Sequence, residues 1–152
     1  MVRLGEIAAE VGRGLFAGAA GTVAMTASST LEAKLRERGS SSAPADAAGK
    51  LLGVQPRDPA GQARFSNVVH WSYGTSWGAV RGLLHVAGLD GPKAVAAHFA
   101  AVWGSAQIML PSLDVAPAPW KSEPQEIAID MLHHAVYVVA TNVAYAGLLR
   151  SS

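Results

Sequence analysis

The stretch from Ala94 to Leu113, AVAAHFAAVWGSAQIMLPSL, contains no Asp, Glu, Lys or Arg. At ~1.5 Å per residue, a helix of this length approaches the ~30 Å hydrocarbon thickness of a bilayer. Apart from His98 and Gln107, its side chains are apolar or small on every helical face, whereas a helix of a soluble protein keeps a polar face in water. The stretch therefore predicts a helix that lies in lipid or is buried all round.

Three further stretches share this character. Residues 14–31 and 131–149 also lack charged side chains, and residues 65–80 lack them up to Arg81, which lies close enough to a helix end to extend its guanidinium to the interface. A soluble bundle of 152 residues has room for one such helix but not for three or four. We therefore predict an all-α fold, a four-helix transmembrane bundle in a single membrane domain (1–152), with spans at approximately 14–33, 65–87, 94–112 and 127–149.

A charged loop, residues 34–64, separates the first two predicted spans. Within it, residues 43–54 predict a short interfacial helix, because Ser42 and Pro44 suit a helix start and Gly53 suits a helix end. Basic side chains number five on the amino-terminal side of the predicted bundle and seven on the side of this loop. This small difference favours a cytoplasmic loop.

Composition excludes some classes of function. The chain has 12 basic and 11 acidic residues with no basic stripe, which argues against nucleic-acid binding. It has no cysteine, so disulfides and thiolate metal sites are excluded. Its mean hydropathy of +0.23 is high for a soluble domain and modest for a membrane protein. The expected partner is the lipid bilayer, and the number of packing faces is also compatible with a homo-oligomer.

Glycines recur at four-residue spacing in the first two predicted spans, at positions Gly14 and Gly18 and then Gly74, Gly78 and Gly82. Helices in lipid associate by close van der Waals approach, which small residues one turn apart permit. The spacing therefore predicts helix-packing surfaces at these five positions.

Ionisable side chains inside a membrane span are costly and usually face the interior of the bundle. The fourth predicted span has the most, with Glu126, Asp130 and His133 on one face and His134 beside them. The alternative is that the two acids form a wet first turn, where they suit the helix dipole. The polar intramembrane candidates are His70, Arg81, His98, Glu126, Asp130, His133 and His134.

These histidines and carboxylates are also ligand types for a metal ion or haem. Asp130-x-x-His133 has the spacing of carboxylate-bridged helix bundles, but a second such pair is missing from the sequence. We therefore predict no cofactor and no catalytic residue, and a metal- or haem-dependent membrane enzyme remains the alternative. A soluble α-bundle that binds an apolar ligand is the third hypothesis.

The order of these features resembles the YagU-like bacterial inner-membrane proteins. The resemblance rests on Val69-His70-Trp71-x-x-Gly74, on the histidine of the third span, on the segment 110–120 with its Pro117-Ala-Pro-Trp120, and on His133-His134. It extends over roughly residues 14–149 and departs from the family in the longer charged loop. It implies a multi-pass location in the cytoplasmic (inner) membrane and a link to acid tolerance. The leading hypothesis is accordingly a non-enzymatic membrane protein, either a small polar-cored conduit or an accessory factor in stress or acid tolerance.

Overall fold

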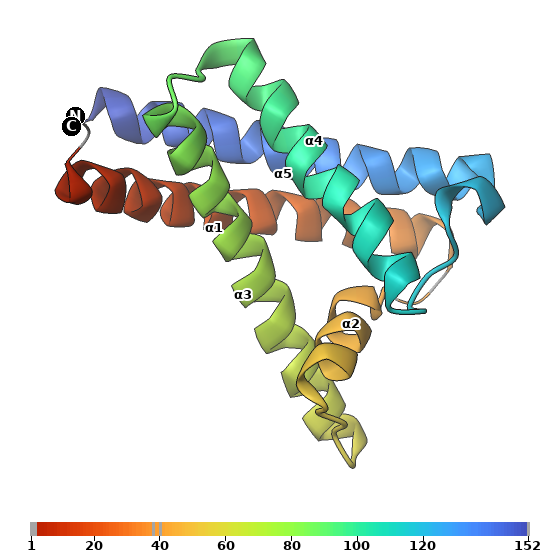
Figure 1. The fold of residues 1–152 in the computed structure, drawn as a ribbon. Helices are drawn as coiled ribbons and strands as arrows, with labels where there is room; N and C mark the ends of the chain where they lie inside the picture. Colours follow the sequence, from red (N-terminus) through yellow and green to blue (C-terminus); the bar gives the residue numbers. More distant parts are fainter. Residues whose placement is uncertain (1–2, 38, 40, 152) are drawn as a thin grey trace.

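The computed structural model describes residues 3–37, 39 and 41–151, and these contain helices and no strand, which confirms the all-α prediction. Figure 1 shows α1 and α5 lying side by side, with α3 and α4 crossing them obliquely. The helices are α1 (Leu4–Leu35), α2 (Ala43–Leu52), α3 (Pro59–Val86), α4 (Gly91–Ser112) and α5 (Pro124–Arg150), with the 3-10 turn η1 (Pro119–Lys121) before α5.

The short helix expected between the first two long helices is present as α2. Pro44 lies in its first turn, and Gly53 ends it with a left-handed φ of 65°. α2 packs against the first half of α3, at the lower end of the view in Figure 1. Its predicted place at a membrane interface stays a prediction.

The turn between α3 and α4 also depends on glycine. Gly88 adopts a φ of +79°, a conformation that costs glycine nothing, and it lets the Leu89 N–H donate to the Leu84 carbonyl at 2.8 Å. Asp90 then returns to extended backbone and begins α4. The tight connection keeps α3 and α4 next to each other in antiparallel directions.

The contact between α1 and α3 depends on backbone-to-backbone packing. A Cβ added at Gly18 would lie 2.6 Å from the Thr75 carbonyl oxygen and 2.8 Å from the Cα of Gly78, and one added at Gly14 or Gly82 would also clash with backbone. Gly74 faces the side chain of Thr22 instead. The five glycines predicted as packing positions therefore all lie where α3 meets α1.

Two of the four long helices are long and apolar enough to cross a membrane by length and composition. They are α4 and α5, with mean hydropathies of 1.2 and 1.3 over their best windows. α1 and α3 are long enough, but many of their residues are small, polar or charged, as in the first half of α3 with Gln62, Arg64 and Asn67. Hydropathy therefore supports α4 and α5 as candidate spans, and it does not by itself support α1 and α3.

Candidate functional site

Ionisable side chains gather in two clusters at opposite ends of the α1–α5 pair. We call the first the His133 cluster; it comprises Ser28, Glu32, Arg36, Glu126 and His133. His133 is only 6% exposed, and its Nδ1 lies 2.9 Å from the Ser28 hydroxyl. Its Nε2 lies 3.7 Å from a Glu32 carboxylate oxygen, a distance for an ion pair rather than a hydrogen bond.

Arg36 closes the His133 cluster on the side of the loop. It donates to Glu32 at 3.1 Å and also forms an ion pair with Glu126, so that it links the end of α1 to the start of α5. The carboxylate of Glu126, followed by that of Glu32, raises the pKa of this guanidinium above its ordinary value. The cluster can therefore tie α1 and α5 together by charge.

The second cluster, which we call the Arg81 cluster, comprises Glu10, Arg81, His85, Asp90 and Tyr145. Arg81, expected near a helix end with its guanidinium at the interface, is 4% exposed and buried in the bundle. Its guanidinium lies 4.2 Å from the ring centroid of Tyr145 and donates through Nη2 to Asp90 at 3.1 Å. Tyr145 in turn donates to Glu10, which joins α5 to the start of α1.

Asp90 sits at the outer edge of the Arg81 cluster. The hydrogen bond from His85, at 2.8 Å, is the main cause that lowers the pKa of this carboxyl below its ordinary value, and Arg81 lowers it further. A carboxylate that accepts hydrogen bonds from an arginine and a histidine ring is stabilised in its ionised form. Asp90 thus balances the buried charge of Arg81.

Asp130 and His133 do not share a site, although the sequence places them on one face. Asp130 accepts from Trp103 at 2.9 Å and from Gln107 at 3.1 Å, both on α4. His134 also turns toward Asp130, with its Nδ1 2.8 Å from the Asp130 carbonyl oxygen. Since α5 lies between α1 and α4, a difference of three residues directs Asp130 to one neighbour and His133 to the other.

The two remaining histidines each have their own partners. His98 is fully buried, with Nε2 3.1 Å from the Trp77 carbonyl oxygen and Nδ1 3.2 Å from the Asn142 amide. His70 lies 2.8 Å from the Thr26 hydroxyl. Over residues 3–37, 39 and 41–151, no group of three or more His, Asp and Glu side chains is arranged to hold a metal ion.

The sequence alone did not single out several of the partners. Ser28 lies one helical turn before Glu32, and Tyr145 follows Tyr137 by two turns, so both lie on faces that already contain polar residues. Trp103 had no such signal, because tryptophan is counted as an apolar residue, and Asn142 follows Thr141 but points about 100° away from it around the helix. Only the packing of α4 against α5 reveals them.

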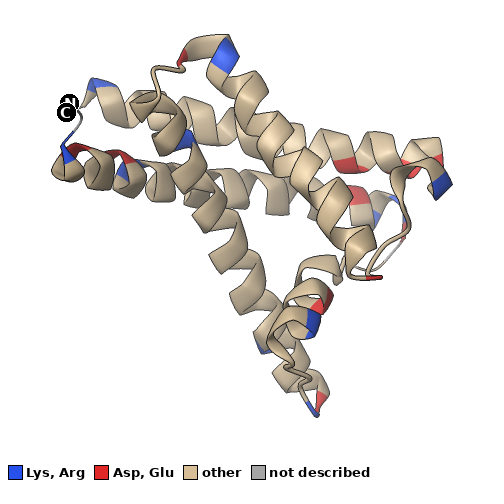
Figure 2. Ribbon diagram, in the orientation of Figure 1, with Lys and Arg blue, Asp and Glu red and all other residues tan. Residues whose placement is uncertain are grey.

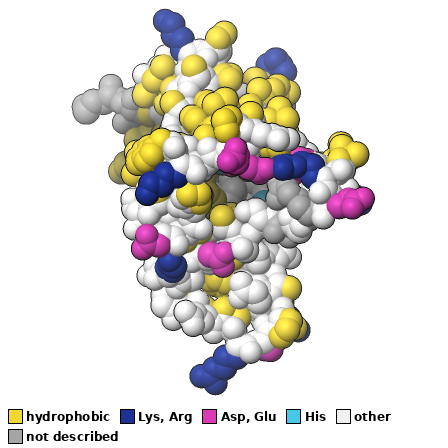
Figure 3. Space-filling model, turned by 90° about the vertical axis from the view of Figure 1, so that its right-hand side faces the viewer, with side chains coloured by type: hydrophobic (Ala, Val, Ile, Leu, Met, Phe, Trp, Pro, Cys, Tyr) yellow, Lys and Arg dark blue, Asp and Glu magenta, His cyan; other side chains and the backbone are white. Residues whose placement is uncertain are grey.

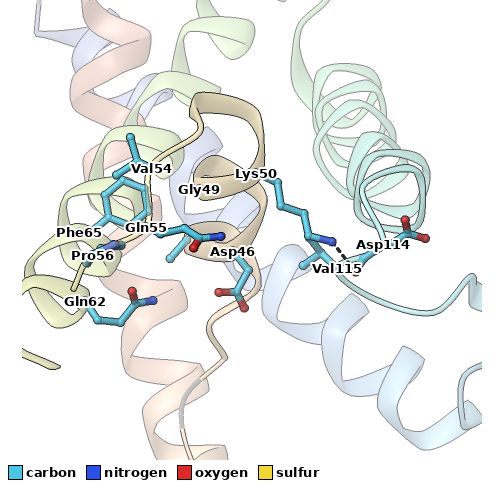
Figure 4. Close-up of a pocket in the computed structure, with 11 residues that line it drawn as sticks. Asp46, Gly49, Lys50, Val54, Gln55, Pro56, Gln62, Phe65, Asp114 and Val115 are labelled. Atoms are coloured by element: carbon cyan, nitrogen blue, oxygen red, sulfur yellow. Dashed lines mark hydrogen bonds between the residues drawn. The ribbon is translucent and has the colours of Figure 1, made fainter. Parts of the chain in front are cut away.

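A cavity of about 480 Å³ lies apart from both clusters, between α2, the start of α3 and the segment that follows α4. Figure 4 shows Lys50 extending from α2 across this space. Its ammonium donates to the carbonyl oxygens of Leu113 and Asp114 at 2.6 and 3.0 Å. Lys50 therefore caps the carbonyl end of α4 and holds α2 against it.

Comparison of the chain with models of protein families, with curated proteins and with solved structures gave no match. The resemblance to YagU-like proteins therefore stays a prediction.

Proposed function

We propose that the chain is a four-span protein of the cytoplasmic membrane, in which α1, α3, α4 and α5 all cross the bilayer. The main support is the distribution of polarity. Several of the most buried side chains are polar, and large apolar side chains point outward from all four long helices. The buried polar residues are Thr22, Arg81, His98, His133, Thr141 and Asn142, and the exposed apolar ones include Phe16, Val23, Val68, Leu83, Ile108, Val139 and Val143.

This distribution suits lipid better than water. Phe16 at 77% and Ile108 at 72% exposed would each leave most of an apolar side chain in water, and many such residues on one small chain form a large apolar surface. In a bilayer the same surface is solvated by acyl chains, while the polar side chains find hydrogen-bond partners inside the bundle. A membrane location therefore accounts both for the buried polar side chains and for the exposed apolar ones.

The charges support two further spans beside α4 and α5. Residues 14–31 of α1 and 65–80 of α3 carry none, which corresponds to a rise of ~27 and ~24 Å. Figure 2 shows charged residues gathered toward the ends of the helices, with uncharged stretches between them, and Figure 3 shows acidic and basic side chains over the face that includes the end of α1 and the start of α5. The two clusters would then lie near opposite surfaces of the membrane.

The interior favours an accessory protein over an open conduit. The hydroxyls of Thr22 and Thr141 donate to carbonyl oxygens of their own helices, and that of Tyr137 donates to the Gly74 carbonyl. α1 and α3 touch through glycine backbone. These contacts stabilise a packed interior rather than a water-filled path.

The His133 cluster joins two of the proposed spans by polar and charged contacts. His133 of α5 faces the Ser28 hydroxyl and the Glu32 carboxylate of α1, and Arg36 pairs with Glu126 at the start of α5. The protein would act as an accessory factor of the membrane, in stress or acid tolerance, with a packed interior.

Single-cysteine labelling tests the four-span arrangement directly, because the natural chain has no cysteine. Gly5→Cys reports on the start of α1, Ser41→Cys on the segment before α2, Ala87→Cys on the α3–α4 turn and Gln125→Cys on the start of α5. In sealed vesicles, we expect an impermeant maleimide to reach positions 5 and 87 from one side of the membrane and positions 41 and 125 from the other. Labelling of position 41 from the same side as position 5 or position 87, or release of the protein by alkaline carbonate, would contradict the proposal.

A further inference from the structure

A groove of about 410 Å³ runs along the outside of α1 beside α3. It lies beyond the glycine crossing, the close contact of α1 and α3 at Gly14, Gly18 and Gly78, at a place where the two helices have diverged. Thr26 lines it, but its hydroxyl is already engaged by His70 and by the Thr22 carbonyl oxygen, so that the groove gains little polarity there. The other lining residues are Val23, Ala27, Thr30, Leu31, Lys34 and Trp71.

The walls of the groove are mostly apolar and open to the outside. Val23 is 56% exposed, Leu31 is 60% exposed and Trp71, on α3, is 39% exposed. Val23, Ala27 and Lys34 lie on one stripe of α1, a distance of ~16 Å along the helix. The length and the apolar lining of the groove thus suit the binding of one extended hydrocarbon chain.

One end of the groove carries a positive charge. Lys34 is exposed in the last turn of α1, and its ammonium forms no ion pair with a described residue. In the four-span arrangement this end of α1 reaches the membrane surface, because the charged loop begins here. An apolar groove that ends in a free ammonium at the level of the headgroups is complementary to an anionic amphiphile.

We propose that this groove, defined by Val23, Ala27, Leu31, Trp71 and Lys34, is a docking site for an anionic membrane phospholipid. One acyl chain lies along α1 against Trp71, and the headgroup phosphate pairs with Lys34. The inference rests on the proposed membrane location and adds a lipid class to it. A zwitterionic phospholipid fills the apolar part equally well but brings its own cation to Lys34, so charge decides the preference.

The site is tested with the full chain in phosphatidylcholine vesicles that contain a small fraction of a brominated lipid. The fluorescence quenched at Trp71 is the difference between the wild type and Trp71→Phe. We expect brominated phosphatidylglycerol to compete for this position about fivefold better than brominated phosphatidylcholine, the factor that one lysine near a membrane surface typically supplies. Equal quenching by the two lipids would overturn the proposal.

Three variants separate the site from general lipid contact. Lys34→Gln should remove the preference for the anionic lipid, Lys34→Arg should keep it, and Lys121→Gln, an exposed lysine outside the groove, should leave it unchanged. A preference that survives Lys34→Gln, or is lost equally in Lys121→Gln, would overturn the proposal. Flotation of each variant with the vesicles distinguishes the two claims, since a chain that does not float refutes the membrane location as well, whereas one that floats without a preference refutes only the lipid site.

Discussion

Substituting Gly78 by alanine probes the contact that sets the arrangement of α1 and α3. A Cβ at Gly78 would lie 2.6 Å from the Cα and 2.7 Å from the N of Gly18, and it would also meet the carbonyl group of Gly14. Because these are backbone atoms of a helix, no side-chain rotation can relieve the clash. The two helices must move apart, with loss of van der Waals contact along the crossing.

The size of the effect follows from two opposing contributions. Alanine is favoured over glycine in a helix by about 1 kcal/mol, whereas overpacking costs about 1–3 kcal/mol, with the upper end expected where backbone is met. Gly78→Ala should thus destabilise the protein by about 2 kcal/mol. Gly104→Ala in α4, where an added Cβ meets nothing within 4 Å, should instead stabilise it slightly.

The two variants are compared by SDS unfolding in mixed micelles, with helical circular dichroism as the signal. We expect a gap of about 3 kcal/mol between them in the free energy of unfolding, with Gly104→Ala the more stable. Equal stability of the two variants would refute the argument that close glycine contact holds α3 on α1.

Two further substitutions test polar contacts away from the glycine crossing. Because His85 chiefly lowers the pKa of Asp90, the stabilisation from this carboxylate is present above its ordinary value of 3.8 and is lost as pH falls through the lower folded-state pKa. Asp90→Asn should therefore remove part of the acid limb of a stability–pH profile, and an unchanged limb would contradict the contact. Trp103→Phe removes the donor to Asp130 and should lower the free energy of unfolding in SDS by about 1 kcal/mol. Trp120→Phe, at a residue 83% exposed, is the control and should change it by no measurable amount. Equal SDS midpoints of the two variants would count against the contact between Trp103 and Asp130.

The helices were predictable from the sequence because lipid-length uncharged stretches and glycine or proline boundaries are local signals. The predicted span 94–112 lies within α4 (Gly91–Ser112), and 127–149 lies within α5 (Pro124–Arg150). α1 begins at Leu4, well before the predicted span, because Glu6 and Glu10 are compatible with a helix although not with the middle of a membrane. Absence of charge thus predicts where a span lies, not where its helix ends.

The polar contacts were less predictable, because they depend on which neighbour each face meets. Helical spacing places Asp130 and His133 on one side of α5, yet they contact α4 and α1 respectively. Arg81 was expected to extend its guanidinium to the interface, but its partner Tyr145, more than 60 residues later in the chain, could not be predicted. Such pairings follow from the crossing of the helices, which no local pattern encodes.

The glycine crossing and the lipid groove are two consequences of how side-chain size changes along α1. Gly14 and Gly18 bring its first half onto α3, whereas Val23 and Leu31 face the place where the helices have separated. Gly18 and Lys34 are ~24 Å apart along α1, far enough for independent effects. Gly78→Ala should therefore lower the free energy of unfolding in the wild type and in Lys34→Gln by the same amount. A stability cost that differs between the two backgrounds by more than about 0.5 kcal/mol would show that lipid docking and helix crossing are coupled.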